Sequence, residues 1–186
     1  MNILHLAIQM NLSKKLKRSG WIRENIKDPE SLAEHCFTIT VLITILSKYL
    51  GVSEEKLIRM AIVHNFSALL TEDFVVERGK KIFKRLQKKK EKIEKEAIRT
   101  IFWDYDMNYS NLYNEMVQRK SKESIIFWQI DKLATTIQAY DYEKEQNKSL
   151  SEFFENARIY IKEPLLKRVN QLFSCFRPSG KAGLSR

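Results

Sequence analysis

The chain has 186 residues and a formal net charge of +10, and it contains only five glycines and three prolines. This length suffices for one domain with a sizeable apolar core, and the scarcity of Gly and Pro favours an all-helical protein. No apolar run reaches the roughly 18–20 residues of a membrane span, and the two cysteines, Cys36 and Cys175, form no disulfide framework. We therefore expect one cytoplasmic domain over residues 1–176, followed by a disordered tail over residues 177–186.

The first thirty residues predict one helix and then an irregular connection. Residues 2–16 carry apolar side chains at helical spacing, and Ser19-Gly20 interrupts that pattern. Residues 21–30 contain Asp28-Pro29, a pair that does not fit inside a helix.

Two further helices bring histidines into apolar surroundings. Ser31 and Glu34 form a capping box at the start of an almost wholly apolar helix, which places His35 in its first turns. Ser53 begins the next helix, in which His64 follows an apolar run and points inward. Each histidine has two readings: a core side chain bonded to a backbone carbonyl, or a ligand in a metal site shared between helices.

A strongly basic helix comes next. Residues 76–99 contain eleven Lys and Arg against four Glu, an excess of seven positive charges. Five apolar residues in and just after this segment fall mainly at spacings of four and seven and form one stripe: Ile82, Leu86, Ile93, Ala97 and Ile101. The cations of residues 78–99 therefore either form a solvated face or bind phosphate groups, including those of nucleic acid, by releasing counterions.

The last third predicts two more helices. Ser121 begins one in which Asp131 stands among apolar residues. Burying this carboxylate requires a charge partner, a hydrogen bond or a cation, unless Asp131 lies at an exposed edge beside Lys132. Residues 149–152 form a capping pattern for a final helix, which Pro164 interrupts or restarts.

Four stretches in this order resemble the HD-domain superfamily of metal-dependent phosphohydrolases. They read LKRSGWIRENIKDPESLAEHC, RMAIVHN, TED and FWQIDKLATTIQAYDYE, and the match as a whole runs from about Leu12 to Phe154. Within the superfamily they are most similar to the 5′-deoxynucleotidase branch, which includes the YfbR-like and HDDC-like proteins. The resemblance implies an all-α helical bundle with a central metal and phosphate pocket. It also implies a homodimer that hydrolyses deoxynucleoside monophosphates to deoxynucleosides and phosphate.

The resemblance also implies roles for particular residues. A divalent transition metal such as Mn²⁺ or Co²⁺ would be bound by His35, His64 and Asp131, with Asn65 as a weak ligand. Nucleotide binding would fall to Arg18, Trp21, Thr71 and Asp73, of which Asp73 is also a catalytic candidate.

Two positions depart from the family pattern. Asn65 replaces the Asp of the His-Asp pair, which removes one negative charge and leaves a poorer metal ligand. Ala68 replaces the Glu that acts on the attacking water, and losing a general acid or base typically costs about 10²–10⁴-fold in rate. Glu72, one turn after Ala68, is a speculative substitute for the missing carboxylate. Two hypotheses therefore stand: a weakened phosphohydrolase, or an inactive HD-fold protein that binds nucleotide or nucleic acid.

Overall fold

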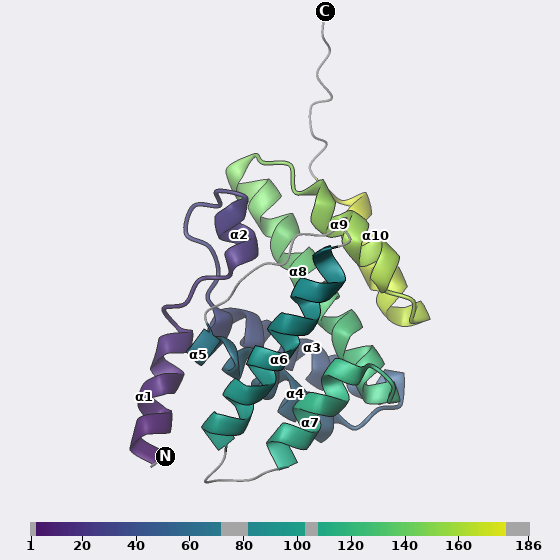
Figure 1. Cartoon of the computed structure of the whole chain (residues 1–186). Helices are drawn as coiled ribbons and strands as arrows, with labels where there is room; N and C mark the ends of the chain where they lie inside the picture. Colours follow the sequence, from purple (N-terminus) through teal and green to yellow (C-terminus); the bar gives the residue numbers. More distant parts are fainter. Residues whose placement is uncertain (1–2, 72–81, 103–107, 178–186) are drawn as a thin grey trace, which may run out of the picture. The chain divides into compact units, whose positions relative to one another are not determined.

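The computed structural model describes residues 3–71, 82–102 and 108–177, and the regular elements in these ranges are all helices (Figure 1). In chain order they are α1 (Ile3–Ser13), α2 (Ser19–Arg23), α3 (Leu32–Leu50), α4 (Glu54–Phe66), α5 (Ala68–Thr71), α6 (Ile82–Phe102), α7 (Asn108–Gln118), α8 (Lys122–Gln146), α9 (Ser151–Tyr160) and α10 (Pro164–Cys175). The predicted all-α fold is confirmed. No helix within these ranges is both long enough and apolar enough to cross a membrane.

The chain divides into two compact units, Met1–Phe127 and Trp128–Arg186, and the boundary falls within α8. In the first unit α3 packs on α4, α4 on α7, and α6 lies beside α7 (Figure 1). The core of this unit includes four side chains that are fully buried: Ile39, Ile43, Leu57 and Met60. In the second unit α9 and α10 pack as a pair. Most of the predicted tail, residues 178–186, lies outside the described residues.

The ends of α3 and α4 follow the predicted local signals. The Ser31 hydroxyl accepts a hydrogen bond from the Glu34 amide, and the Glu34 carboxylate accepts one from the Ser31 amide. These bonds from Ser31 lower the pKa of Glu34. Gly51 closes α3 with a φ of +61°, a conformation that costs glycine little. Ser53 caps α4 by accepting from the Lys56 amide at 3.3 Å.

Two local predictions were wrong. Ser19-Gly20 does not interrupt helical structure but opens the short helix α2, which the buried ring of Trp21 anchors to the core. Residue Ser149 does not cap α9: its N-cap is Leu150, which forms no side-chain capping bond. In the basic helix α6, Ala97 and Ile101 of the apolar stripe are buried, whereas Leu86 and Ile93 are 44% and 41% exposed.

One face of α3 is also more exposed than its apolar composition predicted. Phe37, Val41, Ile45 and Tyr49, which follow one another at intervals of four residues, are all exposed. We call these four residues the α3 stripe. The opposite face of α3 carries the buried side chains, among them His35, Ile39 and Ile43. Helix α3 therefore has one buried face and one exposed face, although apolar residues occur on both.

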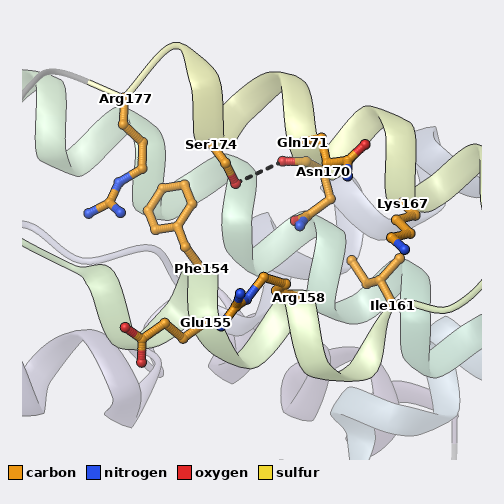
Figure 2. Close-up of a pocket in the computed structure, with 9 residues that line it drawn as sticks. All are labelled: Phe154, Glu155, Arg158, Ile161, Lys167, Asn170, Gln171, Ser174 and Arg177. Carbon is orange, nitrogen blue, oxygen red and sulfur yellow. Dashed lines mark hydrogen bonds between the residues drawn. The ribbon is translucent and has the colours of Figure 1, made fainter.

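In the second unit, Pro164 begins α10 as predicted. The side chain of Gln129 in α8 accepts hydrogen bonds from the amides of Lys162 and Glu163, which holds the turn before Pro164. A hollow of about 250 Å³ lies between α9 and α10, and Figure 2 shows the Asn170 amide directed into it. None of the predicted site residues lines this hollow.

Candidate functional site

The two histidine-bearing turns of α3 and α4 lie at the same level of the packed helix pair. Cys36, the residue after His35, contacts the Ala61 carbonyl at 3.5 Å and is hydrogen-bonded by the Asn65 side chain. Burial raises the pKa of the Cys36 thiol, and its hydrogen bonds with Thr40 and Asn65 oppose that shift. The residue next to His35, Cys36, therefore contacts the turn of α4 that carries His64 and Asn65.

His64 and Asn65 are held differently. The ring of His64 is half-buried and packs edge-on against Phe127, with centroids 5.5 Å apart. Asn65 is 7% exposed, and its amide nitrogen donates to the backbone carbonyl of Ala61, one turn back in α4, at 3.1 Å. A carboxylate at position 65 could not make this bond, because it has no hydrogen to donate. The Asn65 amide therefore makes a hydrogen bond within α4 that an Asp at this position, as in the family pattern, would not make.

A buried carboxylate that we did not predict, Glu30, gathers three of the predicted site residues. Its Oε1 accepts a hydrogen bond from the Trp21 indole nitrogen at 2.7 Å. The same oxygen lies 3.5 Å from His35 Nδ1 and 3.6 Å from Arg18 Nη1. Glu30 and His35 are 6% and 1% exposed, so the carboxylate and the imidazole face one another in a desolvated place. There, electrostatic interactions are stronger than in water.

A short antiparallel bridge brings Glu30 to this position. Lys17 and Ser31 form the bridge, the Arg18 amide donates to the Glu30 carbonyl, and the Leu32 amide donates to the Leu16 carbonyl. The sequence offered no signal for this pairing, because a bridge between separated loop segments has neither helical nor alternating periodicity. The stretch before Ser31 was predicted only as an irregular connection, in which an acidic residue is ordinarily solvated.

Asp131 lies in the second unit and is 2% exposed, so the prediction of an exposed edge is wrong. Its carboxylate is paired with the ammonium group of the next residue, Lys132, at 2.7 Å. A buried carboxylate needs such a partner, and the pair satisfies that requirement without a metal ion. A metal that took Asp131 as ligand would compete with Lys132 for the same carboxylate.

The other predicted site residues fall at or beyond the end of the first described range. Thr71 is the last residue of α5, and the position of its side chain is not described. Glu72 and Asp73 lie outside the described residues. Ala68 begins α5 and is 9% exposed. The roles predicted for Thr71, Glu72 and Asp73 therefore stay predictions.

The side chains predicted to bind the metal are of types that divalent transition metals accept as ligands, although they include one carboxylate fewer than the family pattern. Imidazole nitrogens are good ligands for such ions, and a ligating histidine commonly has a carboxylate on its other ring nitrogen, as Glu30 stands to His35. Within the described ranges, no group of three or more His, Cys, Asp and Glu side chains could hold a metal ion. The ligand set of His35, His64, Asp131 and Asn65 thus stays a prediction.

Curated relatives match the chain over most of their own length. A protein of Dictyostelium discoideum called 5′-deoxynucleotidase HDDC2 is 31% identical, over 84% of this chain and 88% of that protein. The protein of the same name from Danio rerio is 26% identical, over 91% of this chain and 87% of its own. The Schizosaccharomyces pombe protein 5′-deoxynucleotidase hdd1 is also 26% identical, over 83% and 79% of the two chains.

Solved structures agree with these relatives. A conserved hypothetical protein from Pyrococcus furiosus superposes with a TM-score of 0.75 at 26% identity, over 92% of this chain and 99% of that one. A predicted metal-dependent phosphohydrolase from Magnetospirillum magnetotacticum has the same fold, with a TM-score of 0.63 at 17% identity over 92% and 89% of the two chains. The family model described as HD domain matches residues 10–172. The resemblance read from the sequence is confirmed, and the chain belongs to the HD domain family.

Proposed function

We propose that the chain is a divalent-metal-dependent phosphohydrolase that releases phosphate from 5′-deoxynucleoside monophosphates, with weak turnover. The observation that carries this proposal is the cluster in which Arg18, Trp21 and His35 surround the buried Glu30 carboxylate. Family membership supports it, since the similar Dictyostelium and Schizosaccharomyces proteins are named 5′-deoxynucleotidases.

In this proposal His35, His64 and Asp131 hold the metal, and Asn65 is a weak further ligand. Two neutral imidazoles and one carboxylate leave a divalent ion with a net positive charge, so we expect weaker binding than in a site with two carboxylates. When bound, Mn²⁺ or Co²⁺ would supply positive charge that stabilises the phosphate group during its transfer. To bind the metal, Asp131 would have to give up its ion pair with Lys132, which weakens metal binding further.

Arg18 is the residue proposed to bind the phosphate. Its Nη1 is buried 3.6 Å from Glu30 Oε1 and makes no hydrogen bond, so this donor is unsatisfied and a phosphate oxygen that reached it would gain a charge-assisted bond. Trp21 is only 1% exposed and its indole nitrogen bonds to Glu30, which leaves little of the ring for a sugar to touch. In this proposal Trp21 acts mainly by holding Glu30, while Thr71 and Asp73 contribute to nucleotide binding.

Weak turnover follows from Ala68, because a methyl group cannot move a proton to or from the attacking water. Glu72 and Asp73 are the remaining catalytic candidates near this position in the sequence. Removing Glu72 from an active preparation without loss of rate would exclude its speculative role.

Metal binding provides the direct test. Adding Mn²⁺ at about 100 times its Kd is expected to stabilise the wild-type fold by about 2.7 kcal/mol, because the ion binds only the folded state. This shift should accompany slow phosphate release from deoxynucleoside monophosphates. His35→Ala should remove both effects, whereas His5→Ala, which changes the third histidine of the chain, should remove neither. A wild-type protein with no thermal shift and no phosphate release would contradict the proposal.

The alternative is an inactive HD-fold protein that binds nucleotide through the pocket or nucleic acid through the basic helix, residues 78–99. The observation in its favour is that α6 exposes most of its described cations: Lys88, Lys89, Lys92, Lys95 and Arg99. Glutamates interleave with them, and Lys90 is paired with Glu94 at 3.7 Å, which lowers the local positive charge. Binding to DNA or RNA that weakens steeply with added salt would support this alternative.

We also propose that the protein forms a homodimer through the α3 stripe. A contiguous exposed apolar face on a helix is typical of an interaction surface, and two-fold symmetry allows one such stripe to pack on its copy. Ile45→Glu is expected to convert the dimer to single chains, as measured by light scattering. Ile159→Glu in α9 is the matched control, because both isoleucines are 58% exposed. A dimer that survives Ile45→Glu would exclude this interface. A cytoplasmic location stays a prediction.

A further inference from the structure

Glu30 is the one carboxylate of the described structure that three predicted site residues share. A single oxygen, Oε1, accepts a hydrogen bond from the Trp21 indole nitrogen at 2.7 Å. The same oxygen faces His35 Nδ1 at 3.5 Å and Arg18 Nη1 at 3.6 Å, and these two nitrogens are close enough for an ion pair but make no hydrogen bond. The carboxylate side chain is 5% exposed, so water does little to satisfy it. Burying a charge in this way is unfavourable unless partners compensate, and here all three partners come from the predicted site.

The arrangement is also anchored at the backbone. The Arg18 amide donates to the Glu30 carbonyl at 3.0 Å, so the main chains of these two residues are tied together as well as their side chains. His35 follows in the first turns of α3, whose start is set by the Ser31 capping box. Glu30 therefore has little freedom to turn away from the imidazole, and its negative charge is held beside His35.

We propose that Glu30 is a positioning residue that holds His35 for metal binding and supplies buried negative charge that Asn65 does not. The proposal rests on the function proposed above. A carboxylate on the second nitrogen of a ligating imidazole fixes the ring, selects its tautomer and raises its basicity as a ligand. Asn65 contributes no charge. The negative charge of Glu30 therefore compensates a larger part of the positive charge of the metal ion than it would beside a His-Asp pair.

The test is the Mn²⁺ affinity of Glu30→Gln, measured by titration calorimetry without substrate. The amide oxygen can still accept from Trp21, so the substitution removes the charge while keeping the shape and the indole bond. We expect the Kd for Mn²⁺ to rise about 10–100-fold, the usual effect of losing such a partner. Glu30→Asp, which restores the charge on a shorter side chain, should recover part of the affinity.

Glu34→Gln is the matched control. Glu34 is one residue from His35 and caps the same helix, but its bonds go to Ser31 and not to the imidazole. We expect this variant to lose some thermal stability and to keep the wild-type Kd for Mn²⁺. Equal Mn²⁺ affinity in wild type and Glu30→Gln would overturn the proposal, and so would equal weakening in Glu30→Gln and Glu34→Gln.

A metal-free measurement separates this inference from the proposed function. In ¹⁵N-edited NMR spectra of the metal-free protein, the His35 ring should carry its proton on Nδ1, the nitrogen that faces Glu30. Glu30→Gln should shift this ring toward a mixture of tautomers, while the His64 ring stays unchanged. Unchanged His35 signals would overturn the positioning role even if the protein binds no metal, whereas an altered His35 ring in a protein without Mn²⁺ affinity would refute only the proposed function.

Discussion

Asn65→Asp combined with Ala68→Glu is expected to raise kcat/KM for phosphate release from deoxynucleoside monophosphates by about 10²–10⁴-fold. The two changes restore different things. The carboxylate introduced by Asn65→Asp returns the charge that favours metal binding, and the one introduced by Ala68→Glu returns a group able to move a proton at the attacking water. A steady-state phosphate assay with Mn²⁺, run on the parent and the double variant, measures the gain.

The structure adds a cost to the first change. The Asn65 amide donates to the Ala61 carbonyl at 3.1 Å, and Asp cannot replace that bond. With Asn65 only 7% exposed, Asn65→Asp should destabilise the metal-free protein by about 1–3 kcal/mol, the usual cost of an unsatisfied buried group. Mn²⁺ should recover this loss in the variant, because the ion gives the new carboxylate a partner. Chemical denaturation with and without Mn²⁺ measures both numbers.

Asn65→Asp with Ala68→Gln is the matched control for the rate. Gln has the size of Glu without its acid–base function, so this variant should bind Mn²⁺ as the double restoration does and gain little in rate. If the restored variant binds Mn²⁺ and still releases no phosphate, the pocket lacks more than these two residues. In that case the inactive, ligand-binding alternative is favoured.

Glu143→Ala is expected to lower the free energy of unfolding by about 2–4 kcal/mol, below the full range for a buried ion pair because Arg177 is partly exposed. The carboxylate of Glu143 is 3% exposed and accepts from Arg177 Nε at 2.8 Å, Arg177 Nη2 at 2.7 Å and the Leu150 amide at 2.6 Å. These bonds raise the pKa of Arg177, whose guanidinium also lies over the Phe154 ring at 4.1 Å. The Glu143 side chain therefore joins α8 to Leu150, just before α9, and to Arg177, two residues after α10.

Glu155→Ala is the control for the charge alone. Glu155 also interacts electrostatically with Arg177 but is exposed and forms no hydrogen bond with it that the structure describes, so its removal should change stability by less than about 0.5 kcal/mol. Thermal unfolding compares Glu155→Ala with Glu143→Ala. Adding Arg177→Ala and the variant that combines Glu143→Ala with Arg177→Ala gives the coupling energy of the pair. Equal melting temperatures for Glu143→Ala and Glu155→Ala would contradict this account.

Much of the fold followed from local signals. The capping box of Ser31 and Glu34, the cap at Ser53 and the stop at Gly51 were read correctly, because each depends on residues within one helical turn. The restart at Pro164 is of the same kind. The ordered set of motifs also led to the right family, which the match over residues 10–172 confirms.

The sequence by itself determined the helical class, the HD domain family and the starts of α3, α4, α8 and α10, and it named the candidate residues at positions 18, 21, 35, 64, 65 and 131. Only the tertiary structure decided that Asp131 is buried and paired with Lys132, that the α3 stripe is exposed, and that Glu30 lies against Trp21, His35 and Arg18. Periodicity marks which residues share a helix face, but burial depends on what packs against that face. Glu30 reaches His35 and Arg18 through a bridge between two loop segments, and contacts of that kind leave no pattern along the chain.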